Sequence, residues 1–334
     1  MVLSSEEISK YKINPLDELF EPPAYCFIND VPSLTAGNFS LIYGKKKAGK
    51  TFLLGGVVAS AINRSLQIGA VNGCLPDDKN VVLYFDTEQS QYHANRTIKR
   101  ICSLSGNPTP ENLFAYGLRP LSPEERLAFI EYVIDTTPNV GLVAIDGIRD
   151  LLTMGINDEQ EATELTSLFL KWSYDLNLHI ILLLHQNKND VNARGHIGSE
   201  VVNKAETIIS VTKENKNNLF KVVCEDSRDK PFDDFAFSIS DEGLPISTEI
   251  SVTKNKKITN PNYISEDKHY TFLDRVFEDN SKVSCTAFKD DICYTFAVSD
   301  KPSRDFISYY ISKGWIKRDN DGNNKFYEYM LKMD

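Results

Sequence analysis

The segment GKKKAGKT, from Gly44 to Thr51, carries the clearest chemical pattern in the sequence. It matches the GxxxxGK[ST] loop, in which glycines allow close wrapping and successive backbone N–H groups point at phosphate oxygens. Lys50 supplies a positive charge for the β- and γ-phosphates, and the Thr51 hydroxyl is placed to ligate Mg²⁺. The sequence therefore predicts a site for nucleotide phosphates, formed by Gly44, Lys45, Lys46, Lys47, Ala48, Gly49, Lys50 and Thr51. Lys45, Lys46 and Lys47 either form a solvated rim or contact phosphate or DNA.

Carboxylates follow two further apolar segments. Asp146 ends VGLVAID (140–146) and can hold the water shell of Mg²⁺ beside the loop. Glu88, in FDTE at 85–88, can orient and deprotonate an attacking water. The alternative for this second position is a helix start, with Thr87 as the cap and Glu88 in the first turn.

A glutamine follows another apolar segment, HIILLL at 179–184. At such a strand end, Gln186 can sense the γ-phosphate through a hydrogen bond and relay its loss to the next loop. That loop, NDVNARGHIGSEV, is polar and contains glycine, so it is expected to be a mobile contact loop. His185 is interpreted as a packed or hydrogen-bonded imidazole.

These residues require strands that end at one edge of a sheet. The apolar segments 39–43, 81–85, 113–118, 140–145 and 179–184 are predicted to be strands buried on both faces. Amphipathic segments near 50–64, 90–104, 123–137 and 158–176 are predicted to be helices between them. This alternation predicts an α/β fold with a mostly parallel sheet covered by helices. From Thr207 the pattern is β only, so antiparallel strands are expected at one sheet edge.

The last part of the chain has its own pattern. Residues 1–250 are assigned to the nucleotide-binding domain, with an N-terminal lead-in at 1–30, and the polar segment 251–267 to a linker. Residues 268–334 contain helical segments near 269–279, 286–297 and 304–314, followed by WIKR, DNDGNN and KFYEYM. Three helices followed by two strands and a tight turn predict a winged-helix domain.

Composition excludes several classes of protein. The chain has 334 residues, 41% of them hydrophobic and 25% charged, as in an ordinary globular protein. It shows no apolar run long enough to span a bilayer and no secretory signal at its start, so a cytoplasmic protein is expected. The six cysteines lack metal-ligand or disulfide spacing. A net charge of −10 argues against indiscriminate coating of nucleic acid, although not against a local basic channel.

The motifs GKKKAGKT, FDTE, VAIDGIRDLL, LLLHQNK, RGHIGSEVVNKAETIISV and VVCEDSRDK occur in an order and spacing that resembles the RecA/DnaB superfamily. The likeness is closest to compact RepA-type hexameric helicase ATPases of plasmids and mobile elements. It covers about residues 25–240. The resemblance implies a RecA-like core that binds ATP and Mg²⁺, with Glu88 activating water and Gln186 sensing phosphate. It also implies that the loop carrying Arg194, His196 and Ser199 faces single-stranded DNA.

The same resemblance implies a role for Arg228. In such rings an arginine on the late antiparallel strands reaches the γ-phosphate bound by the neighbouring subunit. The family often has lysine two positions earlier, whereas this chain has Asp226. A surface ion pair between Arg228 and Asp226 or Asp229 is the alternative.

The predicted winged helix offers a second surface for nucleic acid. Basic and polar residues at the start of its third helix and on its wing are candidates for contacts with duplex DNA. They are Lys301, Ser303, Arg304, Lys317, Arg318 and Lys325. Tyr309, Tyr310 and Trp315 are expected in or near the core. Because residues 268–334 carry 11 basic and 11 acidic side chains, docking of a protein is the alternative.

Three functions are compatible with these patterns. The first is a DNA-dependent ATPase that forms a homo-oligomer, such as a hexamer, and acts as a helicase or helicase loader in replication or transfer of a mobile element. The second is a RecA-like ATP switch that docks a recombinase, an initiator or a regulator. The third is a DNA-binding regulator in which ATP controls oligomerisation.

Overall fold

The computed structural model describes residues 4, 9, 11–16, 20–186, 193, 195–214, 218–241, 243–248, 261, 266–278, 281–296, 298, 300–321 and 324–330. The chain divides into two compact units, Met1–Ile250 and Ser251–Asp334, and each unit has its own hydrophobic core. Within the described residues, no helix has the length and apolar character that crossing a bilayer requires. The six cysteines all lie in described segments and are free thiols.

A nine-stranded sheet forms the centre of the first unit, in the order β13-β12-β11-β10-β3-β9-β8-β6-β7. The strands from β10 to β7 in this order run parallel, and β11 to β13 are antiparallel additions at one edge. The parallel strands are β3 (Phe39–Gly44), β6 (Val81–Asp86), β7 (Leu113–Gly117), β8 (Val140–Asp146), β9 (His179–His185) and β10 (Thr207–Lys213). The added strands are β11 (Leu219–Ser227), β12 (Phe235–Ile239) and β13 (Pro245–Thr248). This confirms the predicted α/β fold, with a mostly parallel sheet and late antiparallel strands.

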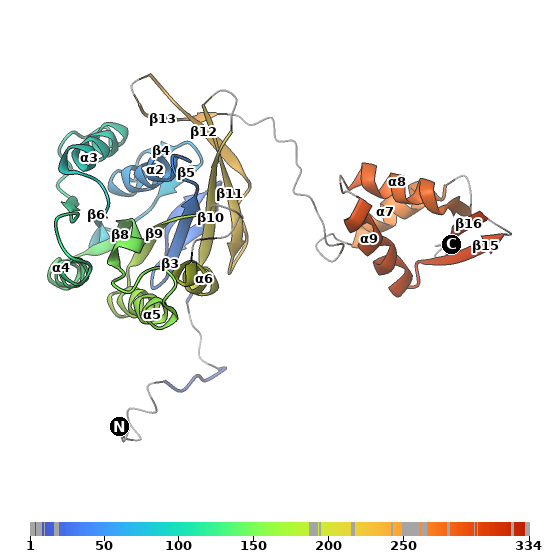
Figure 1. The fold of residues 1–334 in the computed structure, drawn as a ribbon, viewed down its shortest axis with the longest axis horizontal. Helices are drawn as coiled ribbons and strands as arrows, with labels where there is room; N and C mark the ends of the chain where they lie inside the picture. Colours follow the sequence, from blue (N-terminus) through green and yellow to red (C-terminus); the bar gives the residue numbers. More distant parts are fainter. Residues whose placement is uncertain are drawn as a thin grey trace. The chain divides into compact units, whose positions relative to one another are not determined.

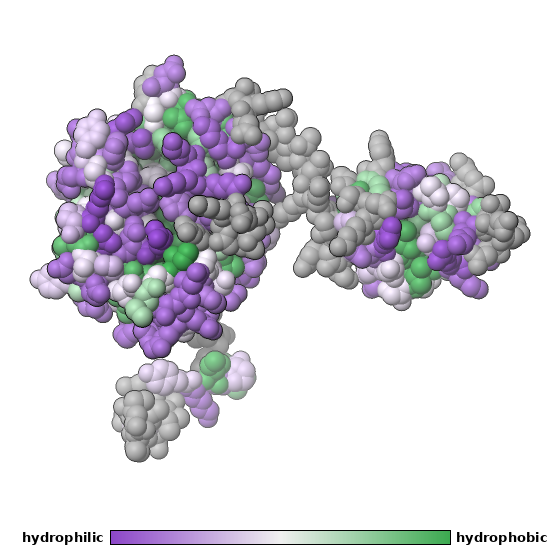
Figure 2. Space-filling model, in the orientation of Figure 1, coloured by the Kyte–Doolittle hydropathy of each residue, from purple (hydrophilic) through white to green (hydrophobic). Residues whose placement is uncertain are grey.

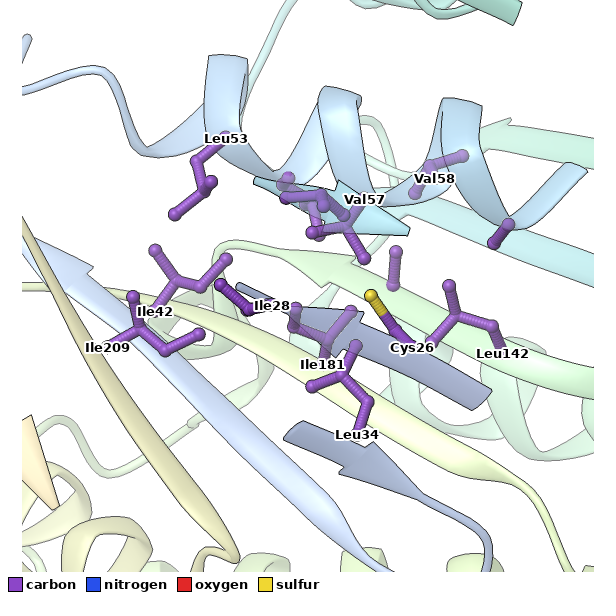
Figure 3. Close-up of a cluster of buried hydrophobic side chains, with 14 of the residues drawn as sticks. Cys26, Ile28, Leu34, Ile42, Leu53, Val57, Val58, Leu142, Ile181 and Ile209 are labelled. Atoms are coloured by element: carbon purple, nitrogen blue, oxygen red, sulfur yellow. The ribbon is translucent and has the colours of Figure 1, made fainter. Parts of the chain in front are cut away.

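Helices cover both faces of this sheet (Figure 1). α2 (Lys50–Ile62) and α3 (Gln91–Ser105) lie on one face, and α4 (Pro123–Thr136), α5 (Glu159–Leu176) and α6 (Gly195–Lys204) lie on the other. Alternate residues of β3 show why its sequence is apolar throughout. Ile42 packs under α2, and Leu41 and Tyr43 pack on the opposite face. Figure 3 shows Leu53, Val57 and Val58 of α2 above Ile42, Ile181 and Ile209 of three adjacent strands.

The chain around the sheet forms short additional elements. β1 (Ala24–Ile28), β2 (Val31–Thr35), β4 (Gln67–Ile68) and β5 (Val71–Gly73) form a small sheet in the order β2-β1-β5-β4. The short helices η1 (Asp77–Lys79) and η2 (Ile148–Leu151) follow β5 and β8. Residues 24–28, which the sequence suggested as part of a lead-in, are therefore a strand, and Cys26 and Ile28 pack against the α2 face of the large sheet (Figure 3).

The second unit contains three helices and a three-stranded sheet. The helices are α7 (Glu266–Val276), α8 (Cys285–Thr295) and α9 (Asp300–Ser312), and β14 (Lys282–Ser284), β15 (Ile316–Asp321) and β16 (Asn324–Tyr329) pair in the order β14-β16-β15. The helices and the β15–β16 hairpin agree with the sequence, and β14 is an addition. Tyr310 and Trp315 are buried and Tyr309 is half-buried, as expected.

A histidine connects α7 to Pro261, in the segment before that helix. Buried His269 lies with Nδ1 2.9 Å from the Tyr310 hydroxyl and Nε2 3.0 Å from the Pro261 carbonyl oxygen. The Nε2–H therefore donates to Pro261, and Nδ1 accepts from Tyr310. Pro261 is buried, and α7 already begins at Glu266. The described end of the predicted linker is thus part of the second unit.

Candidate nucleotide-binding site

The P-loop connects the last residue of β3 to the first residue of α2 without room for side chains at its two glycines. A Cβ atom at Gly44 would lie 2.3 Å from the Val211 carbonyl oxygen, and one at Gly49 would lie 2.6 Å from the Phe220 ring. Gly49 also has φ +94°, which favours glycine. Packing within the fold therefore requires both glycines. Lys45, Lys46 and Lys47 are exposed on the loop, and Ala48 is buried beneath it.

The Lys50 side chain turns back over the loop. Its ammonium group donates to the carbonyl oxygens of Gly44 at 3.0 Å and Lys45 at 3.1 Å. Burial lowers the pKa of Lys50 to about 8, against the opposite effects of Asp146 and Glu88. The charge is thus held at the mouth of the loop by carbonyl dipoles that an anionic oxygen can replace.

Asp146 lies where β8 ends and contacts two hydroxyl groups. Tyr84 donates to its Oδ2 at 2.9 Å, and Thr51 forms a second hydrogen bond with its side chain. Burial, and then the charge of Asp86, raise the pKa of Asp146 to about 6. A carboxylate beside a P-loop hydroxyl is a set of hard oxygen donors that fits Mg²⁺. These contacts bring together Thr51 and Asp146, the two metal ligands that the sequence suggested.

Asp86 organises the turn that carries Glu88. Its Oδ1 accepts from the backbone N–H groups of Glu88 at 3.1 Å and Gln89 at 2.7 Å. Its Oδ2 is buried and has no hydrogen-bond partner among the described residues. Asp86 also pairs with Asp146 across the strands β6 and β8. A buried, unpaired carboxylate oxygen next to Asp146 adds to the negative potential that favours a cation here.

His185 lies between Lys50 and Glu88. Its Nδ1 is 3.1 Å from Lys50 Nζ, and its Nε2 is 3.4 Å from Glu88 Oε2. The ammonium group can only donate, so Nδ1 accepts and the Nε2–H donates to the carboxylate. This hydrogen bond is the main cause that lowers the pKa of Glu88, which keeps the carboxylate ionised. The expected hydrogen-bonded imidazole thus links the phosphate-binding lysine to the candidate base.

Gln186 follows β9 directly beside the loop. Its N–H donates to the Gly44 carbonyl oxygen at 3.0 Å, and it forms an isolated bridge with Ala193. These contacts bring the predicted phosphate sensor to the P-loop, although they do not test its role.

The segment expected to be a mobile contact loop is a helix from Gly195 onward, so that prediction is wrong there. A Cβ atom at Gly195 would lie 2.4 Å from the Ile156 carbonyl oxygen, and one at Gly198 would lie 2.6 Å from the Ala193 backbone. The glycines serve close packing of α6, whose Ile197 and Val201 are buried. His196 and Ser199 are exposed on α6, and Arg194 lies outside the described residues.

Arg228 lies near the amino end of β3, whereas the P-loop follows its carboxyl end. Its N–H donates to the Glu206 carbonyl, and Glu206 N–H donates to the carbonyl of Phe39, the first residue of β3. Gly44 is five residues further along β3, a distance of about 17 Å. The guanidinium group is exposed and donates to the Lys204 carbonyl oxygen at 2.8 Å. Arg228 therefore does not reach the phosphate site of its own chain.

The second unit presents part of the predicted DNA surface. Exposed positions include Arg304 on α9 and Lys317, Arg318 and Lys325 on the β15–β16 hairpin. Ser303 is fully buried, so its predicted contact with DNA is wrong. It follows Pro302 on the face of α9 that packs into the unit. The Lys301 side chain lies outside the described residues.

Tyr84 and the positioning role of Asp86 were not found from the sequence. Tyr84 and Asp86 lie two residues apart on β6, so their side chains share a face of the strand. The only sequence signal was a tyrosine in an otherwise apolar segment next to FDTE. Their importance depends on which strand lies beside β6, which is a tertiary property.

Comparisons with known proteins find one family model and similar solved structures. The model of a family described as an AAA domain matches residues 14–191. Among solved structures, the crystal structure of the RadB recombinase matches with a TM-score of 0.46 and 18% sequence identity, over 67% of this chain and 93% of that chain. A likeness at this level carries no argument about function. The search of curated proteins finds no match.

Proposed function

Because this chain belongs to the AAA domain family, we propose that it hydrolyses ATP with Mg²⁺ at the P-loop beside the ends of β6, β8 and β9. The convergence of Lys50, His185 and Glu88 through contacts of 3.1 and 3.4 Å carries this proposal. It supplies a cation for the transferred phosphate and an ionised carboxylate for water in one connected group.

Each residue has a definite task in this reaction. The backbone N–H groups of the loop bind phosphate oxygens, and Lys50 exchanges its carbonyl partners for the β- and γ-phosphates. Thr51 and Asp146 would hold Mg²⁺, which neutralises charge on the phosphates when bound. Glu88 accepts a proton from water as the water oxygen bonds to the γ-phosphorus and the bond to the bridging oxygen breaks.

Phosphate release measured for Lys50→Ala tests the proposal. Loss of the ammonium group should lower Mg²⁺-dependent ATP hydrolysis by at least about 100-fold. Lys171→Ala is the matched control, because it removes an exposed lysine from α5, on the face of the sheet opposite α2. A Lys50→Ala protein that hydrolyses ATP at the rate of the unchanged chain shows that this site is not the ATPase site.

We further propose that the active species is a DNA-dependent homo-oligomer, such as a hexamer, in which Arg228 acts on the nucleotide of the next chain. Arg228 lies at the strand ends opposite the P-loop, and this position supports action between chains. His196 and Ser199 on α6 are available for single-stranded DNA. The second unit would act as a winged-helix domain and bind duplex DNA. The contacts would come from Arg304, Lys317, Arg318 and Lys325. A helicase or helicase loader of a mobile element fits this proposal.

One contact favours a second candidate, an ATP switch that docks a replication or recombination protein. Arg228 donates to Lys204 of its own chain, and Asp226 replaces the lysine expected nearby. An arginine that stays on Lys204 would leave hydrolysis slow. Strand displacement from a forked duplex separates the two functions, because a switch binds ATP without displacing a strand.

A further inference from the structure

The outward face of α3 carries a positive charge, opposite in sign to the net charge of the chain. The 15 residues of α3 include Arg96, Lys99 and Arg100 and no acidic residue, in a chain of net charge −10. Tyr92, Arg96 and Lys99 are spaced at i, i+4 and i+7, so they form one stripe along the helix. Ala94, Thr97 and Ile101 are buried on the opposite side. We call Tyr92, His93, Arg96 and Lys99 the α3 face.

In the described part of the chain, the positive charges of the α3 face have no ion-pair partner. Among the described residues, no carboxylate lies within ion-pair distance of Arg96 or Lys99. Arg96 and Arg100 are one turn apart and repel each other. Burial, and then the charge of Arg96, lower the pKa of Arg100. Like charges at this spacing destabilise a helix. An anion bound from outside would relieve this repulsion.

Aromatic rings accompany these charges. Tyr92 is 71% exposed, and its ring and the His93 ring are nearly perpendicular, with their centres 5.3 Å apart. An exposed aromatic platform beside cations fits a nucleic-acid strand, because phosphates meet the charges and a base stacks on the ring. A duplex keeps its bases stacked inside, so the platform favours a single strand. Figure 2 shows a mainly hydrophilic surface in the region of α3, which is unlike an apolar protein-docking patch.

The α3 face is also joined to the hydrolysis site. α3 begins at Gln91, directly after the turn in which Asp86 accepts from the N–H groups of Glu88 and Gln89. A nucleic-acid strand bound to α3 therefore contacts a helix that begins only a few residues after Glu88, the candidate base.

We propose that the α3 face binds single-stranded nucleic acid, with Tyr92 stacking on a base and Arg96 and Lys99 contacting phosphates. This assigns a strand-binding site outside α6 and the second unit, and it rests on the proposed nucleic-acid-dependent ATPase. Tyr92 to Lys99 spans about 10 Å, so one chain contacts only a few nucleotides.

Paired variants of the full chain test this site by anisotropy with a fluorescein-labelled oligothymidine of about 20 nucleotides. Tyr92→Ala with Lys99→Gln removes one tyrosine and one lysine from α3. Tyr174→Ala with Lys171→Gln is the matched control, since it removes the same side chains from exposed positions of α5. The α3 variant should weaken binding by about 10-fold to 100-fold, and the control should leave it unchanged. The slope of log K against log salt should also fall by about 0.7 for the lost phosphate contact.

A second measurement locates the strand directly. Ultraviolet crosslinking of an iodouracil-substituted strand should place the adduct on the peptide that contains Tyr92. Absence of that adduct, or equal binding by both variants, overturns the α3 site. Equal weakening of a duplex of the same length overturns the stacking role of Tyr92.

Fluorescent-ATP binding separates this site from the nucleotide site. It should be the same in the unchanged chain and both variants. An α3 variant that loses ATP affinity as much as strand affinity places Tyr92 or Lys99 in the nucleotide site and overturns the proposal. An unchanged chain that binds ATP but no oligonucleotide defeats the nucleic-acid function itself and leaves the ATPase proposal standing.

Discussion

Glu88 combines partial exposure with a specific partner, and both affect what a substitution there does. Its side chain is 46% exposed, and His185 holds one carboxylate oxygen. Glutamine keeps the size of the side chain and an oxygen for that hydrogen bond, but it cannot accept a proton from water. We therefore expect Glu88→Gln to bind ATP with unchanged affinity and to hydrolyse it about 100-fold more slowly. Single-turnover hydrolysis with a parallel binding titration checks this.

A matched variant distinguishes a catalytic base from a residue that only supports the turn before α3. Thr87 donates to the carbonyl oxygens of Asp146 and Gly147, so Thr87→Val disturbs the same turn without touching the carboxylate. Equal losses of affinity and rate in Glu88→Gln would show that the residue supports the turn. Glu88 does not lie in the first turn of a helix, as the alternative from the sequence had it, because α3 begins at Gln91 with Ser90 as its cap.

Among individual residues, the sequence predicts the functional residues that lie within one continuous motif. The P-loop is one continuous segment, so its strand, loop and helix could be predicted together. Asp146 and Glu88 could be predicted as strand-end carboxylates. The hydroxyl of Tyr84 on Asp146 could not, because the pairing of β6 with β8 determines it.

Among the elements, β2, β9 and β10 meet at a buried polar junction away from the P-loop. His179 donates from Nδ1 to the Thr35 carbonyl oxygen at 2.8 Å, and its Nε2 has no partner among the described residues. Glu206 lies 3.7 Å from Nδ1 and accepts from the Thr35 N–H and hydroxyl. Burial lowers the pKa of His179 to about 4 and raises that of Glu206.

This junction predicts how stability changes with pH. The unfolded histidine binds protons below its usual pKa of 6.5, whereas folded His179 stays neutral down to about pH 4. Between pH 6.5 and pH 4 the unfolded state therefore binds more protons than the folded state. As the pH falls through this range, the free energy of unfolding falls by up to about 3 kcal/mol. Glu206 contributes with the opposite sign, because its folded pKa is raised.

The contribution of His179 is isolated by His179→Leu. Chemical unfolding at pH 7 and pH 5 should show a smaller loss of stability for the variant than for the unchanged chain. His93→Leu is the control, because His93 is exposed and its loss should leave the difference between the two pH values unchanged. Equal differences for all three chains would mean that His179 is protonated in the fold.

The small sheet and α6 differ from the sequence interpretation for physical reasons. The strands of the small sheet have between 2 and 5 residues, too few to show a period. α6 contains two glycines and several polar residues, which favour a loop by propensity. Packing of Ile197 and Val201 outweighs that preference, as tertiary contacts often do.

For the whole molecule, the two units predict the result of a truncation. Each has its own hydrophobic core, so residues 1–250 should fold and bind nucleotide without the second unit. Circular dichroism and fluorescent-ATP binding of this fragment check the expectation. An insoluble fragment beside a soluble full chain would mean that the units depend on each other.

The mechanism between chains is tested by mixing two inactive variants. Arg228→Ala should bind ATP normally and hydrolyse it slowly, since arginine fingers contribute about 10³-fold to 10⁵-fold in rate. Mixed with Lys50→Ala, it should recover part of the activity, because an intact loop from one chain can meet an intact arginine from the other. Lack of recovery, with co-assembly demonstrated by native mass spectrometry, would place the effect of Arg228 within its own chain.

The separation of Gly44 and Arg228 by the length of β3 has a consequence for counting active sites. Under the proposed arrangement, each chain carries half of two different sites, and its contacts run head to tail. A row of chains with free ends always leaves one terminal loop without its arginine, whereas a row that closes on itself leaves none. Turnover per chain would then rise as rows lengthen and reach its limit at closure. Hydrolysis would report the shape of the assembly.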